Sequence, residues 1–346
     1  MNAAEPLPRD LLARDRKAEH IRIALERSVQ LDARYFDAWA FEHVALPEIA
    51  GADVDPAVEF LGKRLAAPLL VSCMTGGTEA AARINRHLAQ AAEAAGVAMG
   101  VGSQRKAIED PSQADSFRVR DVAPTVPVLA NLGAVQLNYG FGLAECRAAV
   151  DMVEADALVF HVNVLQEALQ PEGQTDFRGL LDAMGEVAAG IGVPVAVKEV
   201  GCGLSEAVGR ALVARGITLL DTAGLGGTSW ARIEARRSGD VALGEMFADW
   251  GIPTPESIRQ LARIPGATVI GSGGLRSGVD VAKAIGLGAD LAAMAHPFLE
   301  PAMDSAGAVE RKIARVIEEL RIAMLCAGAR SVKELQEAKM VERSMP

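Results

Sequence analysis

ALVFHVNVLQE, residues 157–167, begins with four apolar residues and then places four polar or ionisable side chains within the next seven positions. The apolar run is typical of a strand buried in a sheet that helices cover on both faces. Polar residues that begin where such a strand stops are typical of the catalytic rim of a parallel α/β barrel. They also occur where a strand is followed by a helix whose N-terminus is capped by a polar side chain. The other strand ends must separate these two interpretations.

Eight apolar runs of this kind, this one included, occur from residue 68 onward, and most are separated by stretches with helical spacing. The predicted strands span residues 68–74, 97–101, 127–132, 157–162, 194–198, 217–221, 267–271 and 290–295. The predicted helices span residues 78–95, 145–154, 179–189, 205–214, 255–263 and 277–287. Such alternation predicts a parallel sheet with right-handed crossovers, and eight repeats favour an α/β fold of the (β/α)₈ barrel (TIM barrel) type. A doubly wound sheet would need a G-x-G-x-x-G fingerprint after its first strand, where Met74-Thr75-Gly76-Gly77 stands.

The predicted domain organisation is one barrel at residues 68–330, with an N-terminal extension and a C-terminal tail. Residues 1–67 form the predicted arm and extended segment that cover the barrel, and residues 331–346 form the tail. Within the arm, residues 14–30 have an amphipathic helical pattern, whereas residues 45–63 look extended and irregular. Two long connections, at 102–124 and 223–254, are predicted to lie on the catalytic face, because long βα loops there are usually functional.

The composition excludes several classes of protein. A formal net charge of −10 and the lack of a basic stripe argue against a nucleic-acid-binding protein, although a phosphorylated substrate remains compatible. The four cysteines are far apart and form no CxxC pair, which indicates reduced thiols and neither a disulfide framework nor a zinc site. No apolar stretch is long enough for a signal peptide or a bilayer span. We therefore expect a soluble cytoplasmic protein with no membrane partner.

Glycine-rich loops after the seventh and eighth predicted strands indicate a phosphate site. Gly271-Ser272-Gly273-Gly274 precedes one helix and Met294-Ala295-His296-Pro297 precedes another. In barrels of this type these two loops, with a helix N-terminus, are the recurrent phosphate-binding place. Backbone N–H groups of a Gly-rich turn can also converge on one phosphate. The sequence therefore predicts a phosphate-bearing cofactor.

A lysine, Lys198, ends the apolar fifth strand, where burial of its charge is costly without an anionic partner. The N1–C2 carbonyl region of a flavin, which becomes negative on reduction, is one such partner, and an internal salt bridge is the other. After the second strand, Ser103, Arg105 and Lys106 suit an anion but also suit a solvated basic turn.

Taken together, the motifs resemble those of the type 2 isopentenyl-diphosphate delta-isomerase family, FMN-dependent (β/α)₈ barrels. The resemblance runs from about residue 16 to the late 320s. Its carriers are RKAEHI at 16–21, ALPEI at 45–49, MTGGT at 74–78, GVGSQR at 100–105, NLGAVQLNYG at 131–140, HVNVLQE at 161–167, VKEVG at 197–201, GGTSWARIE at 226–234, WGIPT at 250–254 and SGGLRSG at 272–278.

The resemblance implies a 1,3-proton shift that converts isopentenyl diphosphate into dimethylallyl diphosphate, with FMN, Mg²⁺, and NADPH as the reductant of the flavin. It also implies a homo-oligomer, a tetramer or a multiple of it. The substrate contacts that it implies are Arg16, Lys17, Ser103, Gln104, Arg105, His161, Asn163 and Gln166, and the Mg²⁺ ligand is Glu167. The flavin contacts that it implies are Met74, Thr75, Gly76, Ser103, Asn131, Lys198, Thr228, Gly273, Gly274 and Ala295.

The reaction needs a strong acid, because an unactivated alkene is a weak base. No thiol or His–carboxylate pair in the sequence has an obvious claim to that role; Cys73, the nearest thiol, falls inside a predicted strand. We therefore expect the cofactor to carry the acid–base work and Gln166 to orient the alkene or relay a proton near it.

Four residues depart from the family's common pattern: Cys73, Cys202, Ala223 and His296. Cys73 and Ala223 each replace a hydroxyl that would contact the flavin, and His296 either adds a donor to the phosphate loop or crowds it.

Two other functions stay open. An FMN-dependent 2-hydroxyacid oxidase would need a His base and paired arginines, but the segment after the sixth strand reads Thr228-Ser229-Trp230. A non-catalytic flavin or phosphate sensor is the second.

Overall fold

The computed structural model describes residues 16–343, apart from the side chains of Arg16, Ala18 and Arg27. Eight parallel strands close into a barrel in the order β10-β11-β4-β5-β6-β7-β8-β9. Their bounds are β4 Leu69–Val71, β5 Ala98–Gly100, β6 Val128–Gly133, β7 Ala157–His161, β8 Val195–Lys198, β9 Leu219–Asp221, β10 Thr268–Ser272 and β11 Leu291–Met294. The predicted (β/α)₈ barrel is confirmed, and each of the eight apolar runs overlaps one of its strands.

The strands alternate their side chains between the inside of the barrel and the surrounding helices. On β7, Val159 packs inside the barrel with Leu129 and Ala196, while Leu158 and Phe160 belong to the layer between strands and helices. Both layers are apolar, which explains why the run 157–160 shows no polar alternation. The parallel register pairs His161 with Lys198 and Lys198 with Asp221, so three ionisable residues meet at the carboxyl end of neighbouring strands.

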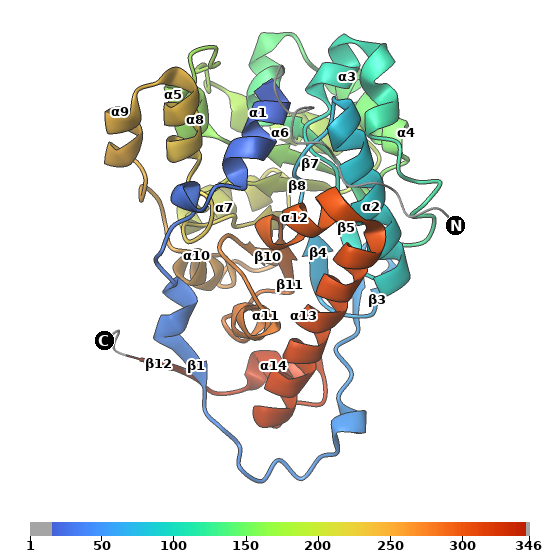
Figure 1. The fold of residues 1–346 in the computed structure, drawn as a ribbon, viewed down its shortest axis with the longest axis vertical. Helices are drawn as coiled ribbons and strands as arrows, with labels where there is room; N and C mark the ends of the chain where they lie inside the picture. Colours follow the sequence, from blue (N-terminus) through green and yellow to red (C-terminus); the bar gives the residue numbers. More distant parts are fainter. Residues whose placement is uncertain (1–15, 344–346) are drawn as a thin grey trace.

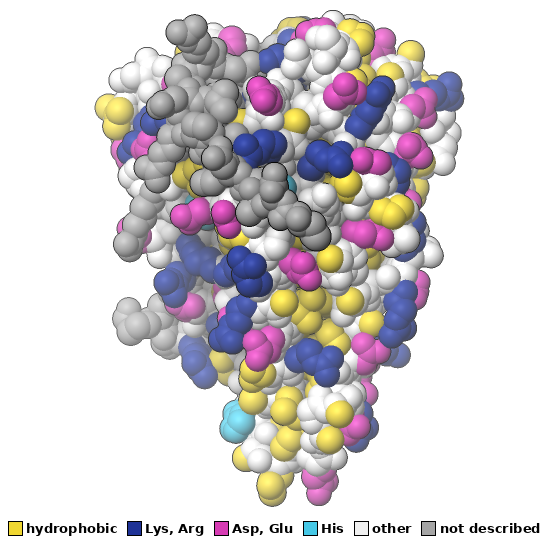
Figure 2. Space-filling model, turned by 45° about the vertical axis from the view of Figure 1, so that its right-hand side comes forward, with side chains coloured by type: hydrophobic (Ala, Val, Ile, Leu, Met, Phe, Trp, Pro, Cys, Tyr) yellow, Lys and Arg dark blue, Asp and Glu magenta, His cyan; other side chains and the backbone are white. Residues whose placement is uncertain are grey.

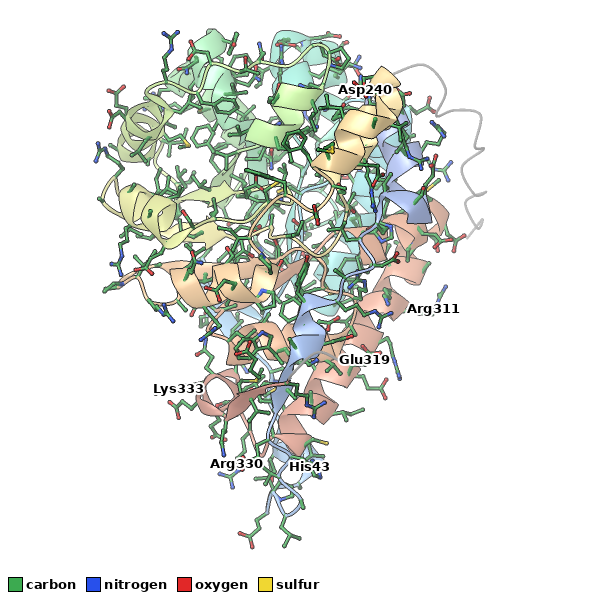
Figure 3. All side chains as sticks on the ribbon, turned by 90° about the vertical axis from the view of Figure 1, so that its left-hand side faces the viewer. His43, Asp240, Arg311, Glu319, Arg330 and Lys333 are labelled. Atoms are coloured by element: carbon green, nitrogen blue, oxygen red, sulfur yellow. The ribbon has the colours of Figure 1, made fainter. Side chains whose placement is uncertain are left out.

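Helices cover the outside of the barrel. The predicted helices appear as α2 Glu79–Ala95, α4 Leu143–Val153, α6 Leu180–Gly190, α7 Glu206–Val213, α10 Thr254–Leu261 and α11 Gly278–Gly286. They are followed by α12 His296–Asp304 and the long α13 Ala306–Cys326, which lies beside α2 and α11 (Figure 1). In Figure 3, Glu319 projects from α13; its carboxylate accepts the Gly278 N–H at the start of α11, at 2.8 Å. This contact caps α11 and fixes α13 against it.

The two long connections fold into short helices near the carboxyl ends of the strands. The first contains α3 Arg105–Glu109 and the 3₁₀ turn Pro111–Ser116, and the second contains α8 Trp230–Ser238 and α9 Val241–Met246. A third short helix, α5 Val164–Leu169, follows β7. Figure 1 shows these helices and α1 gathered at one end of the molecule. Their position agrees with the prediction that long connections lie on the catalytic face.

The arm and the tail differ from the predicted pattern. The helix predicted at 14–30 is α1 Arg16–Ala24, followed by a 3₁₀ turn at Arg27–Val29, and residues before 16 lie outside the described chain. The irregular segment contains the hairpin β2 Val58–Phe60 and β3 Lys63–Leu65.

Residues predicted as a tail are folded against the rest of the chain. They contain α14 Val332–Glu337 and β12 Met340–Glu342, which pairs with β1 Trp39–Phe41. Figure 1 shows β1 and β12 side by side. A pairing between segments some three hundred residues apart leaves no local signal in a three-residue strand, which is why the sequence did not show it.

The end of the molecule opposite the short helices α3, α5, α8 and α9 is tapered. Figure 3 places His43, Arg330 and Lys333 toward the tapered end and Asp240 near the wide end. Charged side chains of both signs are spread over the face seen in Figure 2, and apolar side chains gather toward the taper. Across residues 16–343, none of the helices is both long enough and apolar enough to cross a bilayer.

Candidate active site

A cavity of about 630 Å³ lies at the carboxyl ends of the barrel strands. Its volume falls in the range of sites for small molecules and cofactors. The residues predicted for the site that line it are Lys17, Met74, Thr75, Ser103, Arg105, Asn131, His161, Asn163, Gln166, Glu167, Lys198, Thr228, Gly273, Gly274 and Ala295. The fold therefore brings most of the predicted residues to one place, and the individual roles proposed for them stay predictions.

Two predicted residues do not line the cavity, and a third has no described side chain. Gln104 is fully buried; its Nε2 donates to the Ala149 carbonyl at 2.8 Å and its Oε1 accepts the Asn131 N–H at 2.9 Å, so the amide joins the barrel wall to α4. A Cβ at Gly76 would lie 1.9 Å from the Phe117 ring, so close packing explains this glycine. The side chain of Arg16 lies outside the described residues.

Glu167 is the most strongly held acid in the cavity. Its Oε1 accepts from Asn163 Nδ2 at 2.9 Å, and its Oε2 accepts from Gln170 Nε2 at 2.6 Å and from the Gln174 N–H at 2.7 Å. These three donors face a carboxylate that is only 8% exposed. Asn163 Oδ1 is buried and has no hydrogen-bond partner within residues 16–343. An oriented carboxylate beside an unused carbonyl oxygen suits a hard divalent cation.

Gln166, one residue earlier on α5, belongs to a second network. Its Oε1 accepts from Asn163 Nδ2 at 3.1 Å and its Nε2 donates to Glu234 Oε1 at 2.9 Å. Glu234, on α8, is fully buried; it also bonds Arg237 at 2.5 Å, and its Oε1 lies 3.0 Å from His20 Nε2. The carboxylate thus joins α1, α5 and α8 across the cavity, and Gln166 is oriented by a buried negative charge.

Removing the charge of Glu234 is expected to destabilise this end of the barrel. We expect Glu234→Gln to lower the free energy of unfolding by about 3 kcal/mol, because Arg237 and Gln166 lose a buried partner. Arg237 keeps Glu19 and Glu172, which limits the loss.

Urea unfolding measures this effect. The matched control is Glu245→Gln. The Glu245 carboxylate pairs with Arg232, which lies on the same helix as Glu234, but it is half exposed. Surface pairs of this kind contribute at most about 1 kcal/mol. Equal losses in the two variants would contradict a special role for the buried network.

Two cations face the cavity from different elements. Lys17, on α1, donates to the Ser103 carbonyl at 2.8 Å and lies over the Phe117 ring at 5.2 Å from its centroid. Arg105, at the start of α3, bonds Glu109 at 2.7 Å and Gln174 Oε1 at 3.0 Å. Lys17 and Arg105 therefore bring positive charge from two elements to the cavity that Glu167 also lines, and such charge suits a polyphosphate.

His161 and Lys198 lie on the floor of the cavity. His161 Nδ1 is 2.9 Å from Asn131 Oδ1, which makes Nδ1 the donor. Burial, with the nearby charges of Lys198 and Lys17, lowers the pKa of His161 to about 3, so the ring is neutral. Lys198 Nζ donates to the Glu199 carbonyl at 2.7 Å, and its charge opposes the increase that burial causes in the pKa of Asp221. Asp221, the register partner of Lys198 on β9, is thus an acid whose charged form Lys198 favours, and the anionic partner of Lys198 stays a prediction.

Glu199 holds the loop that follows Lys198. Its Oε2 accepts the N–H groups of Val200 and Gly201 at 2.6 Å and 2.7 Å, and a third bond comes from Cys202. Burial raises the pKa of Glu199 to about 7, although the three N–H donors favour its charged form. This loop contributes Val200 and Gly201 to the cavity wall.

The predicted phosphate loops form a tight glycine cradle. A Cβ at Gly273 would lie 2.2 Å from the Gly224 carbonyl, and one at Gly274 would lie 2.3 Å from the Gly226 carbonyl. Both glycines have positive φ, at 107° and 77°. Among the described residues, the N–H groups of Gly274, Leu275 and Ala295 have no acceptor within the chain. Convergent unused N–H groups beside the N-terminus of α12 fit a phosphate.

Comparisons with known proteins agree with this geometry. The model of the FMN-dependent dehydrogenase family matches residues 20–120 and 253–342. An isopentenyl-diphosphate delta-isomerase of a Nostoc species is 48% identical over 334 residues, 95% of each chain. A Synechococcus isopentenyl-diphosphate delta-isomerase is 50% identical over 321 residues, 91% of this chain and 92% of its own.

The chain belongs to the isopentenyl-diphosphate delta-isomerase family. Among solved structures, a mandelate oxidase mutant has a TM-score of 0.63 at 19% identity, with 96% of this chain and 95% of its own covered. A putative lactate oxidase of Pediococcus acidilactici has a TM-score of 0.68 at 16% identity, with 99% and 98% covered. These two likenesses show the barrel fold that the isomerase family shares with flavin-dependent oxidases.

Several cavity residues of this isomerase-family chain were not singled out from the sequence. They are His20, Gln136, Gln170, Gln174 and Arg276, together with Glu234, which bonds the cavity residue Gln166 without lining the cavity itself. His20 and Glu234 lie inside motifs that carry the resemblance, RKAEHI and GGTSWARIE, so the motifs contained a signal that residue-by-residue reasoning missed. The glutamines bond other cavity residues, and nothing in their sequence context distinguishes them from surface glutamines.

The position of Cys73 is a correction to the predicted strand. The strand predicted at 68–74 ends at Val71, and Cys73 lines the cavity beyond it. Burial raises the pKa of this thiol to about 11, so it is protonated at neutral pH and is a weak acid. Cys73 therefore reaches the site but is a poor proton donor to an alkene, in keeping with the expected role of the cofactor.

Proposed function

We propose that this protein interconverts isopentenyl diphosphate and dimethylallyl diphosphate, with FMN and Mg²⁺ bound in the cavity. The observation that carries the proposal is the meeting of three features in one cavity. A buried carboxylate, Glu167, shares the cavity with the cations Lys17 and Arg105 and with the glycine cradle of the loops after β10 and β11. Diphosphate, metal and phosphate-bearing cofactor each have a matching place.

The diphosphate is proposed to lie against Lys17, Arg105 and Glu167. Within residues 16–343, no group of three or more His, Cys, Asp or Glu side chains is placed to hold a metal by itself. Mg²⁺ would therefore be held jointly by Glu167 and the diphosphate oxygens, an arrangement that is common for Mg²⁺ in phosphate-binding enzymes. Ser103 and Asn163 line the same wall and are proposed as further substrate contacts.

FMN is proposed to bind with its phosphate in the glycine cradle and its ring system over the strand ends. When bound and reduced, with NADPH as the reductant, FMN would supply the donor and acceptor of the proton that moves along the alkene. Lys198 would stabilise negative charge on the cofactor, and Asn131, Thr75 and Thr228 would hydrogen-bond to it. Gln166 would orient the alkene, because Glu234 fixes its amide.

The oxidase alternative needs a histidine base that the segment after β9 does not supply. The cavity wall after β9 carries Thr228 and Trp230. His161 lies on the floor of the cavity, but its pKa of about 3 makes it a weak base for abstracting a proton from a 2-hydroxyacid.

An anaerobic assay tests the proposal. Protein with reduced FMN and Mg²⁺ is expected to convert isopentenyl diphosphate into dimethylallyl diphosphate, and omission of any one component should stop the reaction. Proton NMR of the product in D₂O measures both the conversion and the site of exchange.

Two outcomes would contradict the proposal. Unchanged substrate in the presence of bound, reduced FMN would favour the sensor. Rapid flavin reduction by lactate or glycolate in a stopped-flow experiment would favour the oxidase.

Two further properties stay predictions: a homo-oligomer of four subunits or a multiple of four, and a cytoplasmic location. Light scattering measures the oligomeric state.

A further inference from the structure

His296 is the first residue of α12 and lines the cavity beside the glycine cradle. Its Nε2 is shielded from solvent and has no hydrogen-bond partner within residues 16–343. Buried ring nitrogens are normally paired, so an unpaired one next to unused backbone N–H groups indicates a missing acceptor.

Three groups act on the charge of the His296 ring: the backbone of Ala24 and the guanidinium of Arg276, which line the same cavity, and the carboxylate of Glu300. Burial lowers the pKa of His296 and Arg276 lowers it further, while the Ala24 carbonyl and Glu300 act in the opposite direction. The net direction is downward from 6.5, so the ring is neutral at pH 7 while the cradle holds no anion.

Ala24 is the last residue of α1, the arm helix that contributes Lys17 and His20 to the cavity. Its carbonyl also accepts from Gln30 Nε2 at 3.1 Å. The carbonyl end of a helix attracts a cation. His296 therefore lies between the phosphate cradle and the negative end of the arm helix.

We propose that His296 is a phosphate ligand that takes up a proton when a phosphate monoester fills the cradle, and that the charged ring then ties the end of α1 to the filled site. The inference rests on the proposed binding of FMN. A dianionic phosphate opposite Nε2 favours the imidazolium, which donates from Nε2 to the phosphate and from its other nitrogen to the Ala24 carbonyl. Binding is thereby linked to protonation, and docking of the arm is linked to binding.

The linkage predicts a specific pH dependence. Where the empty site is neutral and the filled site is protonated, affinity for the phosphate falls by up to about tenfold for each pH unit of increase. Riboflavin, which has the same ring system and no phosphate, should show no such dependence. The ratio of FMN to riboflavin affinity isolates the effect of the phosphate group.

The experiment measures both affinities by flavin fluorescence between about pH 6.5 and about pH 8 in three proteins. In the unchanged protein the ratio should fall by roughly tenfold or more across this range. In His296→Gln the fall should disappear, because the phosphate itself, whose second pKa is about 6, only becomes more fully dianionic as the pH rises. The control His87→Gln removes a histidine that faces the Ala302 carbonyl outside the cavity, and should behave like the unchanged protein.

A permanent cation provides the second variant. His296→Lys should keep the preference for FMN and lose most of its pH dependence, because lysine stays charged throughout the range. Hydrogen exchange of residues 16–24 gives an independent readout. FMN, but not riboflavin, should slow exchange in the unchanged protein at about pH 6.5, and should not do so in His296→Gln.

The failures are distinguishable. A protein that binds neither flavin overturns the proposed function. A protein that binds FMN with the same pH dependence in His296→Gln as in the unchanged chain overturns the role of His296 and leaves the proposed function intact. Protection of α1 by both flavins alike would likewise overturn the coupling.

Discussion

Replacing Glu167 by glutamine is expected to lower the isomerisation rate at limiting Mg²⁺ by about 100-fold or more, with FMN affinity unchanged. The carboxylate is the acid that the cavity holds in place with three hydrogen bonds, and a neutral amide is a poor ligand for a hard cation. Added Mg²⁺ should restore part of the rate, since the diphosphate still supplies oxygen ligands.

The same variant should fold normally. A glutamine amide at position 167 would turn its NH₂ toward Asn163 and keep its oxygen toward Gln170 and the Gln174 N–H. Asn163 can turn its own amide to accept, because its Oδ1 has no partner among the described residues, although the turn breaks the bond from its Nδ2 to Gln166 Oε1. The expected loss of stability is therefore about 1 kcal/mol, the size of one ordinary hydrogen bond.

Steady-state rates against Mg²⁺ concentration measure this effect, and FMN fluorescence gives the flavin affinity. The matched control is Glu145→Gln on α4, where the carboxylate accepts the Gly142 N–H at 2.7 Å as part of a helix cap. Its Mg²⁺ dependence should match that of the unchanged protein. Loss of FMN from Glu167→Gln, with Mg²⁺ dependence preserved, would show that Glu167 belongs to the flavin site.

Replacing Lys198 by methionine is expected to weaken the binding of FMN by about 10- to 100-fold. A hydrogen bond from a charged donor contributes about 1.5–3 kcal/mol, and each 1.4 kcal/mol corresponds to a tenfold change. The effect should be larger for reduced than for oxidised flavin, because the reduced ring carries the negative charge that the ammonium faces. Methionine retains most of the side-chain volume, so packing changes little.

The variant should also change the pH dependence of stability. Lys198 opposes the effect of burial on Asp221, so its removal raises the pKa of that carboxyl further. A carboxyl group whose folded pKa lies above its unfolded value loses stability as pH rises, since ionisation then favours the unfolded chain. Lys198→Met should therefore lower the melting temperature more at about pH 8 than at about pH 5.

The control for both measurements is Lys283→Met on α11. Lys283 Nζ donates to the Phe36 carbonyl at 2.9 Å, a bond much like that of Lys198 with Glu199, but away from the cavity. It should leave flavin binding and the sign of the pH dependence unchanged. If Lys198→Met binds both oxidised and reduced FMN with the same affinities as the unchanged protein, the role proposed for Lys198 is contradicted.

The barrel could be predicted because its signal is local and repeated. Runs such as 157–160 are apolar on both faces of the strand, and the stretches between them have helical spacing. Turn and cap residues agree with the predicted boundaries: Thr78 caps α2 through the Ala81 N–H, and Gly96 ends it at a φ of 64°. Each of the six predicted helices therefore begins and ends within about two residues of the predicted positions.

The site was predictable to the extent that strand ends converge. His161, Lys198 and Asn131 could be placed together because parallel strands in a barrel end at the same rim. Gln104 was misplaced because position alone does not show whether a side chain turns to the cavity or into the wall. Its carboxamide bonds Ala149 and Asn131, and such tertiary partners leave no trace near residue 104.

The sequence by itself determined the (β/α)₈ architecture, the family and many of the rim residues, because hydrophobic periodicity, glycine-rich loops and strand ends are properties of short segments. Only the tertiary structure decided which charges meet. It placed Glu234 between α1, α5 and α8, Asp221 beside Lys198, β12 against β1, and His296 between the phosphate cradle and the end of α1. These pairings depend on distances between segments far apart in the chain, and such distances are set only when the barrel closes.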